Sequence, residues 1–294
     1  MVFNMLKLND VYTMDVLEGL KQLPDKSAQI IIIDPPYNIG KNFGNNGDRR
    51  KIEDYLEWAD KWISECTRIM KPNGTMFIYG FDEILAHLSV RITLHKRWLI
   101  WYYTNKNMPT VHFWQRSHEA ILCCWGNDRV FNEDAIREPY TESFLKSSAG
   151  RVRPGTIGRL SKNGKKTVYE AHPGGALPRD VLPIPSLAGG SGIAERWFIC
   201  KTCDKVCSPK ETHEHKGHTI EKHPTQKPLM LCNKLIRSAR QKEGFMLVPF
   251  VGSGSECVAA KQMGLEYIGF DLNPDYIRLA KARLKATKMQ SVLV

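Results

Sequence analysis

The segment that decides the fold is IIIIDPPY, which runs from Ile30 to Tyr37. Four β-branched residues that stop at Asp-Pro predict a fully buried parallel strand, and open α/β sheets carry their chemistry where such strands end. Pro35 and Pro36 have a fixed φ and no N–H group. The turn is therefore predicted to hold the Asp34 carboxylate and the Pro35 carbonyl as a rigid pair of hydrogen-bond acceptors. The alternative is an ordinary turn in which Asp34 caps a following backbone amide.

The length and composition are those of a globular protein with a polyanionic partner. The chain has 294 residues, of which 42% are hydrophobic and 25% charged, and its longest aliphatic run is the four isoleucines. No transmembrane helix is expected, and because the first residues lack the layout of a signal peptide, a cytoplasmic location is predicted. A formal charge of +11 and a pI near 9.2 favour a polyanion, although an excess of lysine also serves solubility.

Helical and strand-like segments alternate along the first half of the chain. Apolar residues at helical spacing predict one short helix after Asp15, a long helix from Ile52 to a stop at Pro72–Gly74, and another helix near 83–93. Strands are predicted at 75–79, 98–103 and 120–125. This alternation predicts an α/β fold with an open, mostly parallel sheet.

A glycine-rich turn follows a further predicted strand near the carboxyl end. Residues 245–249 predict that strand, FVGSGS from Phe250 predicts the turn, and the next strand ends at Asp271. Asp271 stands nineteen residues beyond Gly252, a spacing that suits the binding of ribose hydroxyls. The turn lacks the full dinucleotide fingerprint and the lysine of a Walker motif, so nicotinamide cofactors and nucleoside triphosphates fit it less well.

The segment between the helices and strands of the first half and the glycine-rich turn is rich in glycine, proline and basic residues. Residues 143–192 contain nine Gly and five Pro, and the run from Lys146 to Lys166 contains seven Lys or Arg and no acid. Flexible cations of this kind neutralise DNA phosphates, although solvated loops have the same composition. Together with the net charge, the segment favours a DNA-contacting insertion.

These motifs together resemble those of a known family. The quartet from Asp34 to Tyr37 resembles the DPPY motif of S-adenosylmethionine-dependent DNA amino-methyltransferases, and HPTQKP at 223–228 resembles the segment that opens their cofactor half. The order of the motifs is similar to that of the β class. The resemblance implies a Rossmann-like methyltransferase fold with circularly permuted motif order. It implies a catalytic half at 1–130, a target-recognition insertion at 131–222 and a cofactor-binding half at 223–294.

The resemblance also implies roles for individual residues. The expected catalytic residues are Asp34, Pro35, Pro36 and Tyr37. The residues expected to bind S-adenosylmethionine are Asp15, Val16, Asp34, Thr225, Lys227, Phe250, Gly252, Ser253, Gly254, Asp271 and Asn273. Asp15 would bind the amino group on the adenine of the cofactor. Asp15 and Thr225 also suit helix N-caps. Thr225 and Lys227 would lie near the methionine carboxylate, where a helix N-terminus and a cation favour an anion. The family usually has an acid two residues before Phe250, where this chain has Val248.

The expected reaction is methyl transfer to N6 of an adenine that is flipped out of duplex DNA and stacked on Tyr37. Asp34 and the Pro35 carbonyl would each accept one N–H and favour the positive charge that develops on nitrogen. Asp at the head of the motif resembles adenine enzymes, whereas cytosine-N4 enzymes more often have Ser there. A cytosine-N4 enzyme, an RNA or protein-amide methyltransferase, and a catalytically weak DNA-binding module are the alternatives. The sequence leaves a homodimer and a restriction endonuclease partner open.

A second group of residues has the spacing of a zinc site. Cys200 and Cys203 are separated by two residues, and His213 and His218 follow with finger-like spacing. The polar segment between them could not hold a loop closed by burial, so a metal crosslink would supply its order. Structural zinc is predicted on these four residues, and a solvated basic turn is the alternative. The sequence leaves open whether His215, or the third thiol of this segment, Cys207, is also a ligand.

Overall fold

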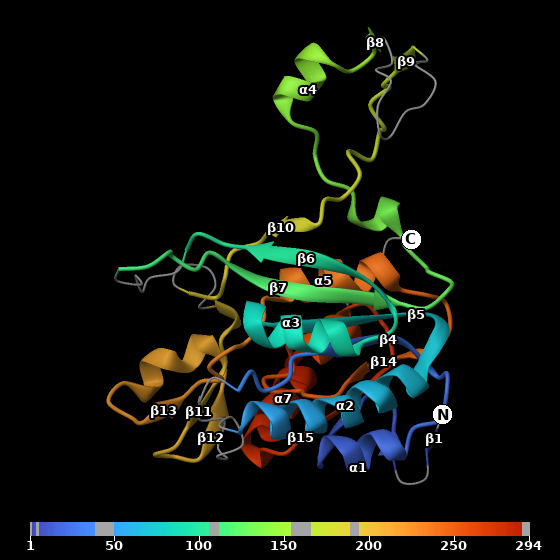
Figure 1. The fold of residues 1–294 in the computed structure, drawn as a ribbon. Helices are drawn as coiled ribbons and strands as arrows, with labels where there is room; N and C mark the ends of the chain where they lie inside the picture. Colours follow the sequence, from blue (N-terminus) through green and yellow to red (C-terminus); the bar gives the residue numbers. More distant parts are fainter. Residues whose placement is uncertain are drawn as a thin grey trace. The chain divides into compact units, whose positions relative to one another are not determined.

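The structure, a computed structural model, describes residues 2–3, 6–38, 50–105, 112–153, 166–188 and 194–289. The chain divides into two compact units. The larger unit combines Met1–Phe131 with Asp180–Val294, and the smaller unit is Asn132–Arg179. Figure 1 shows the helices and strands of both units.

The larger unit is built on a sheet that has eight strands within the described residues. Their order across the sheet is β10-β6-β7-β5-β4-β14-β15-β3. The strands are β3 (Asp10–Thr13), β4 (Ala28–Ile33), β5 (Met70–Gly80), β6 (His95–Tyr102), β7 (His118–Trp125), β10 (Val181–Pro183), β14 (Phe245–Val248) and β15 (Tyr267–Asp271). In the part of the chain that is described, β7 alone runs antiparallel to its neighbours in this sheet. The predicted open, mostly parallel α/β sheet is confirmed.

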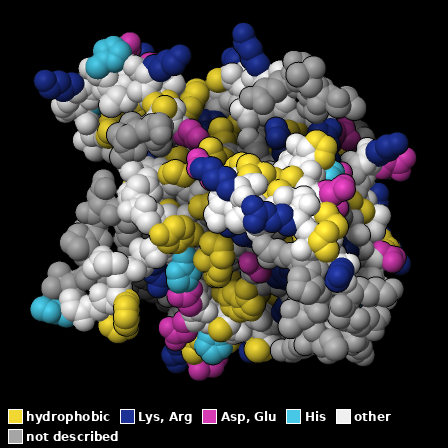
Figure 2. Space-filling model, turned by 90° about the horizontal axis from the view of Figure 1, so that it is seen from above, with side chains coloured by type: hydrophobic (Ala, Val, Ile, Leu, Met, Phe, Trp, Pro, Cys, Tyr) yellow, Lys and Arg dark blue, Asp and Glu magenta, His cyan; other side chains and the backbone are white. Residues whose placement is uncertain are grey.

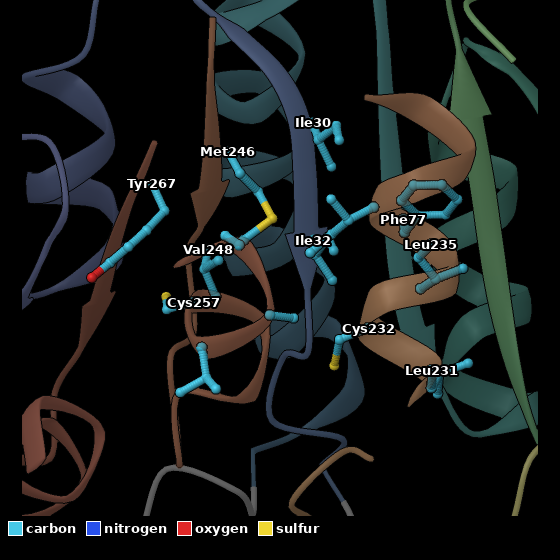
Figure 3. Close-up of a cluster of buried hydrophobic side chains, with 14 of the residues drawn as sticks. Ile30, Ile32, Phe77, Leu231, Cys232, Leu235, Met246, Val248, Cys257 and Tyr267 are labelled. Carbon is cyan, nitrogen blue, oxygen red and sulfur yellow. The ribbon is translucent and has the colours of Figure 1, made fainter. Parts of the chain in front are cut away.

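The four isoleucines of β4 are buried because both faces of this strand are covered. Successive side chains of a strand point to opposite faces of the sheet. Ile31 and Ile33 accordingly belong to the apolar cluster on one face, whereas Ile30 and Ile32 belong to the cluster on the other face, shown in Figure 3. All four side chains are fully buried, as expected for a central parallel strand.

Helices from different parts of the chain cover these two faces (Figure 1). The helices of the larger unit are α1 (Val16–Lys21), α2 (Ile52–Ile69), α3 (Asp82–Arg91), α5 (Leu229–Ala239), α6 (Ser255–Gln262) and α7 (Pro274–Ala286). Buried side chains of α1, α2 and α3 share the cluster of Ile31 and Ile33, whereas those of α5, α6 and α7 share the cluster of Ile30 and Ile32. None of the described helices is long and apolar enough to cross a membrane.

The connections diverge from the central pair of strands, β4 and β14. Ile30 pairs with Met246 and Ile31 with Leu247 in parallel register. From β4 the chain passes through α2 to β5 on one side, and from β14 it passes through α6 to β15 on the other side. Ligands of open α/β sheets bind in the crevice outside the carboxyl ends of strands at such a point.

Two features of the sheet differ from the sequence-based expectation. Residues 10–13, which carry only a weak apolar signal, form the edge strand β3 beside β15. The turn residues Pro72–Gly74 do not stop α2, which already ends at Ile69. They lie inside β5, where the pairing with β4 shifts register between Ala28 and Ile30. The extra residues are thus accommodated as an irregularity within a strand.

The segment predicted as one insertion, 131–222, is divided among several structures. β10 pairs with β6 and belongs to the main sheet, so the inserted unit ends at Arg179. Residues 194–222 carry a small antiparallel sheet of order β12-β11-β13 and a short 3-10 helix. These elements are β11 (Phe198–Cys200), β12 (Lys205–Cys207), η4 (Pro209–His215) and β13 (Ile220–Glu221). A separate ribbon pairs β1 (Val2–Phe3) with β2 (Leu6–Lys7).

The smaller unit contains short elements held by polar contacts. They are η2 (Glu133–Ile136), α4 (Glu142–Ser147), β8 (Val152–Arg153) and β9 (Thr167–Val168). Within this unit Arg179 Nε lies 2.9 Å from Glu138 Oε2, and Arg137 donates to the carbonyl oxygen of Gly175 at 2.9 Å. Of the predicted basic run, residues 154–165 lie outside the described residues.

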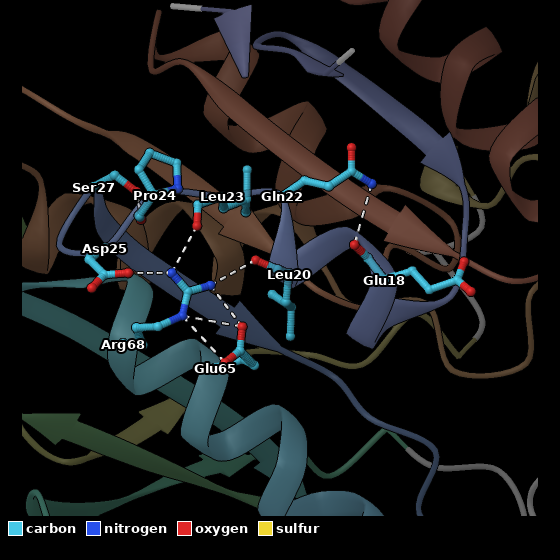
Figure 4. Close-up of polar contacts among 9 residues, drawn as sticks. All are labelled: Glu18, Leu20, Gln22, Leu23, Pro24, Asp25, Ser27, Glu65 and Arg68. Atoms are coloured by element: carbon cyan, nitrogen blue, oxygen red, sulfur yellow. Dashed lines mark hydrogen bonds and ion pairs between the residues drawn. The ribbon is translucent and has the colours of Figure 1, made fainter. Parts of the chain in front are cut away.

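Arg68, in the last turn of α2, ties this helix to the carboxyl end of α1 (Figure 4). Its guanidinium donates to the backbone carbonyls of Leu20 at 3.0 Å and Leu23 at 2.9 Å. It also donates to Asp25 at 2.5 Å and to Glu65 at 2.7 Å. The last carbonyls of a helix have no partner within that helix. One planar cation therefore binds a carbonyl in the last turn of α1 and another just beyond it, and it fixes that helix on α2.

We expect Arg68→Met to lower the free energy of unfolding by roughly 1–3 kcal/mol, because hydrogen bonds from a charged group to two backbone carbonyls and two carboxylates are lost. Urea denaturation followed by circular dichroism measures this change. The matched control on the same helix is Lys61→Met, which removes an exposed ion pair with Glu57 and should change stability little. Equal losses in the two variants would contradict the assigned role of Arg68.

Candidate active site

The carboxyl ends of four neighbouring strands, β4, β14, β15 and β3, open into one pocket. Most of the residues predicted for the site line it, and these are Asp15, Val16, Asp34, Pro35, Pro36, Tyr37, Thr225, Lys227, Phe250, Gly252, Ser253 and Asp271. They come from segments that are far apart in the sequence. The structure therefore brings the DPPY turn, the HPTQKP segment and the glycine-rich turn into one site.

A buried ion pair lies at the catalytic turn. Lys227 Nζ lies 2.9 Å from Asp34 Oδ2 and 3.7 Å from Glu119 Oε2, and its side chain is only 3% exposed. It also donates to the Tyr37 hydroxyl at 2.9 Å. The Tyr37 hydroxyl in turn donates to Asp34 Oδ1. Each carboxylate oxygen of Asp34 is thus held by one donor.

Burial and charge determine the protonation of this cluster. Burial would lower the pKa of Lys227, but the negative charges of Asp34 and Glu119 outweigh it and raise that pKa above its ordinary value. Burial, together with the charge of Asp34, raises the pKa of Tyr37 well above its ordinary value. At neutral pH, Lys227 is therefore a cation and Tyr37 a neutral donor, and both point at Asp34.

The motifs alone do not identify the contact between Lys227 and Asp34. The resemblance places Lys227 near the methionine carboxylate, whereas in the structure its ammonium group lies between two protein carboxylates. Glu119, which follows the first residue of β7, holds the ammonium from the second side and accepts from the Tyr103 hydroxyl at 3.4 Å. The sequence signal that could have indicated Glu119 is an acid at the start of a strand, here β7, which pairs with β5.

Tyr37 also differs from its expected surroundings. The reaction predicted from sequence requires an exposed ring on which a base can stack. In the structure Tyr37 is 2% exposed, and the Phe81 ring contacts it edge-on at a centroid distance of 4.8 Å. Its contribution in this conformation is the hydroxyl group bound to Asp34.

The turn after β14 requires glycine at two positions. Gly252 and Gly254 have φ of +48° and +78°, which residues with a Cβ rarely adopt. A Cβ on Gly252 would also lie 2.7 Å from His223 Nε2. The Gly252 amide donates to Asp271 Oδ2 at 2.7 Å, and the Asn273 amide donates to Asp271 Oδ1 at 2.9 Å. Asp271 thereby joins the turns that follow β14 and β15.

Side chains from α2 and α7 support this turn. The Phe250 ring packs edge-on against Trp58 and Trp62, with centroid distances of 5.7 Å and 5.9 Å. Arg283 of α7 is buried, and its guanidinium donates to the carbonyl oxygen of Ser253 at 2.5 Å. The backbone that would approach a ligand is therefore fixed by contacts from two helices.

Three of the predicted cofactor residues are helix N-caps. Asp15 caps α1, since Oδ1 accepts from the Leu17 amide at 2.9 Å, and it also lines the pocket. Asn273 caps α7 by accepting from the Asp275 amide at 2.9 Å, and Gly254 is the N-cap residue of α6. Asn273 and Gly254 are not among the residues that line the described pocket. Both residues shape the turns that border the pocket, and their contact with the cofactor stays a prediction.

The N-cap expected at Thr225 is wrong. α5 begins at Leu229, with Pro228 as its N-cap residue. The Leu229 amide donates to Glu195 Oε2 at 2.9 Å, so a carboxylate from a distant segment takes the place of a local cap. Thr225 lines the pocket instead.

Glu256, in the first turn of α6, lines the pocket although no motif assigns it. Burial, together with the charge of Asp34, raises the pKa of its carboxyl group to about 7. The Cys232 thiol donates to it at 3.7 Å. Val248, which stands where the family usually has an acid, is buried in the apolar cluster of Figure 3. An acid directly after the glycine-rich turn, two residues beyond Gly254, is the signal that could have identified Glu256.

The structure brings three of the four predicted metal ligands together and replaces the fourth. Ligand atoms of Cys200, Cys203, His215 and His218 all lie within 4.8 Å of one another. The prediction of His213 is wrong, since its side chain is 79% exposed and lies beside Glu214. Residues two apart on the 3-10 helix η4 point to different sides, so η4 directs His215 rather than His213 toward the cysteines.

A mostly parallel sheet in which a glycine-rich turn faces a DPPY turn defines the class of Rossmann-like methyltransferases. The family model described as DNA methylase matches residues 28–282 of this chain. The chain therefore belongs to the DNA methylase family, the N6 and N4 methyltransferases of DNA that use S-adenosylmethionine.

Individual relatives support this assignment. Type II methyltransferase M.HpaI of Haemophilus parainfluenzae is 28% identical over 277 residues, which are 92% of this chain and 72% of that enzyme. Type II methyltransferase M.BamHI of Bacillus amyloliquefaciens is 40% identical over 281 residues, which are 95% of this chain and 57% of that enzyme. The similarity to both enzymes thus extends over nearly the whole chain.

Solved structures share the fold. The cytosine-N4-specific PvuII DNA methyltransferase superimposes with a TM-score of 0.63 at 14% identity and covers 93% of this chain and 85% of its own. The Thermus thermophilus protein TTHA0409, solved in complex with S-adenosyl-L-methionine, has a TM-score of 0.55 at 19% identity and covers 97% of this chain and 99% of its own. The expected methyltransferase fold is confirmed.

Glu256 should make stability depend on pH. Its pKa is about 7 in the folded protein against an ordinary 4.5, so the fold favours the protonated carboxyl. The stability that the fold gains from the protonated form of Glu256 is fully present below pH 4.5 and is lost as the pH rises through 7. Relative to the unchanged protein, Glu256→Gln should therefore gain stability as the pH rises through this range, by up to roughly 3 kcal/mol. Urea titrations across this range measure the difference.

The matched control for this experiment is Glu57→Gln, which changes an exposed carboxylate. Its stability should follow that of the unchanged protein at every pH. If the curve for Glu256→Gln also stays parallel to that of the unchanged protein, the assigned burial of Glu256 is refuted.

Proposed function

We propose that this protein transfers the methyl group of S-adenosylmethionine to N6 of an adenine flipped out of duplex DNA. The observation that supports this most directly is that Asp34 and Pro35, at the end of β4, line the same pocket as Gly252 and Asp271, at the ends of β14 and β15. An amino group bound by the first pair would meet a methyl donor bound by the second pair.

The residues of the pocket fit S-adenosylmethionine. Each oxygen of Asp271 accepts one amide N–H, which leaves lone pairs for ribose hydroxyls. Gly252 allows backbone to approach the ligand where a Cβ would meet His223. Phe250 offers an apolar face, and Asp15 offers a carboxylate for an adenine amino group. When bound, S-adenosylmethionine supplies an electrophilic methyl group on a sulfonium centre.

Asp34 and the Pro35 carbonyl would act on the amino nitrogen of the base. This nitrogen is a poor nucleophile because its lone pair is conjugated with the ring. Two fixed acceptors for its N–H groups favour a pyramidal nitrogen and the positive charge that develops as the bond to carbon forms. The nitrogen must then lose one proton, and Asp34 would be the carboxylate in contact with it.

Lys227 and Tyr37 would prepare Asp34 for this role. A buried carboxylate without a partner is costly, and the Lys227 ammonium at 2.9 Å compensates its charge. Because Lys227 holds one oxygen and the Tyr37 hydroxyl holds the other, the carboxylate is oriented before a base arrives. Pre-orientation of this kind lowers the cost of reorganisation during reaction. We assign both residues as positioning residues, and stacking of the base on Tyr37 stays a prediction.

Charge and exposed aromatic rings support duplex DNA as the substrate. The chain carries a formal charge of +11, and Figure 2 shows Lys and Arg side chains distributed among hydrophobic side chains on one face. Beyond the carboxyl end of β6, Phe113 and Trp114 are 76% and 85% exposed. Cations neutralise phosphates, and exposed aromatic rings stack on bases that leave the duplex.

Adenine is proposed because Asp34, rather than a serine, begins the motif. Cytosine also presents an amino group with two N–H donors, and a pair of acceptors can bind either base. The distinction between the two bases therefore requires analysis of the product.

We expect Asp34→Asn to lower kcat by roughly 10²–10³-fold, the usual loss when one preorganised electrostatic contact is removed from a transition state. Binding of S-adenosylmethionine and of duplex DNA should survive, because most DNA affinity comes from phosphate contacts. Transfer of a tritiated methyl group to DNA, together with calorimetric titration of the cofactor, separates the two properties. Retention of more than a few per cent of turnover would exclude the proposed role. Asp34→Ala should in addition destabilise the fold, because it leaves Lys227 with Glu119 alone.

The product should contain N6-methyladenine. DNA from a methylation-free host that expresses the protein is digested to nucleosides and analysed by mass spectrometry, with the Asp34→Asn variant as the control. Finding N4-methylcytosine alone would refute adenine as the target base, but it would still support methylation of an amino group in DNA. Finding neither nucleoside in DNA treated with folded, cofactor-binding protein would refute the proposed reaction.

A further inference from the structure

Two cysteines and two histidines, residue types that commonly ligate metals, converge in the small sheet β12-β11-β13, and none of them lines the catalytic pocket. Cys200 is the last residue of β11, Cys203 lies in the turn to β12, His215 ends η4, and His218 lies shortly before β13. We propose that these four residues bind a structural zinc ion. This site is additional to the proposed methyl transfer, which uses none of them.

Three of the distances between the ligand atoms match those of a tetrahedral zinc site, and all four atoms lie within 4.8 Å of one another. Cys200 Sγ lies 3.3 Å from His218 Nδ1, and Cys203 Sγ lies 3.5 Å from His215 Nδ1. The two Nδ1 atoms are 3.3 Å apart. In a tetrahedron with Zn–S bonds of about 2.3 Å and Zn–N bonds of about 2.05 Å, sulfur and nitrogen lie about 3.6 Å apart and two nitrogens about 3.3 Å apart. One ion placed among the four atoms would need only small shifts of their side chains to contact all of them.

Hydrogen bonds alone account poorly for this arrangement. A neutral imidazole has a single N–H, and it can point at one neighbour. His215 Nδ1 faces both Cys203 Sγ and His218 Nδ1, and His218 Nδ1 also faces Cys200 Sγ. Each Nδ1 atom therefore has two neighbours but can make only one well-directed hydrogen bond. A central cation removes this conflict because every lone pair can be directed at it.

The surrounding apolar core is too small to order this segment by burial. The apolar cluster of the small sheet consists of Phe198, Cys200 and Cys207 within the described residues. Its strands have two or three residues each. Small units of this kind usually depend on a metal or on disulfides, and the described cysteines are all free thiols. Zinc binding would supply the missing folding free energy.

Cys207 has a positioning role in this arrangement. Its Sγ lies 3.1 Å from Nε2 of His215, on the side of the ring opposite to the nitrogen that faces the other ligands. A partner on the second ring nitrogen fixes the tautomer and the orientation of a ligating histidine. This contact accounts for the third thiol of the segment.

The metal site would also hold residues of the catalytic pocket in place. Lys201, between the two cysteines, pairs with Asp275 of α7 at 2.7 Å, and Asp204 pairs with Arg278 of α7 at 2.7 Å. β13 ends at Glu221, shortly before the HPTQKP segment that carries Lys227. The proposed zinc therefore fixes the turn that enters this segment.

Metal analysis of tag-free protein purified without chelators and under reducing conditions tests this proposal. We expect about one zinc per chain, as in other tetrahedral structural sites. Cys203→Ser and His215→Asn should each lower the zinc content at least tenfold, whereas His213→Asn should keep it, since His213 lies outside the cluster. Cobalt exchanged into the site should give the intense absorption of tetrahedral cobalt bound to thiolates.

These measurements need no methyl transfer, so they are independent of the proposed activity. A folded protein that contains less than a tenth of a zinc per chain and takes up no cobalt would overturn the proposal. Equal loss of zinc in His213→Asn and His215→Asn would overturn the assignment of the ligands. A disulfide between Cys200 and Cys203, detected by mass spectrometry of protein purified without reductant and not reloadable with zinc after reduction, would also overturn it.

Discussion

A buried ammonium group, that of Lys227, sets the main constraint on the larger unit. A cation taken out of water needs anions within reach, and Asp34 at 2.9 Å and Glu119 at 3.7 Å supply them. These three residues belong to the turn after β4, the first residues of β7 and the segment before α5. Compensation of one charge thus fixes three parts of the chain relative to one another. It also leaves the Asp34 carboxylate oriented toward the pocket, where the proposed reaction needs it.

The parts of the fold with strong local signals could be predicted from the sequence. The isoleucines of β4 and the turn of Gly252 and Gly254 are defined by neighbouring residues, and the structure contains both. β3 and β10 could not be predicted in this way. Each is a short edge strand with a weak apolar pattern, and its conformation depends on backbone pairing with β15 or β6. Pairing between distant segments leaves little trace in local composition.

The sequence indicated which residues form the candidate site better than it indicated their contacts. The motifs predicted one site for Asp34, Lys227 and Asp271, and these residues line one pocket. The motifs did not show that Lys227 would bind Asp34. Spacing was also compatible with either His213 or His215 beside the cysteines. The choice depends on which side of a 3-10 helix each ring occupies, and that is decided by packing against Phe198, whose ring contacts His215 edge-on at 5.6 Å.

The pairing of β4 with β14 has a consequence for the nascent chain. A ribosome completes residues 28–33 long before residues 245–248, so one edge of β4 has no strand beside it during most of synthesis. An open edge of apolar, β-branched residues can pair with other chains, and contacts between distant segments form slowly. We therefore expect newly made amino-terminal halves to engage chaperones until β14 emerges. Because the glycine-rich turn follows β14, incomplete chains released early would lack half of the pocket.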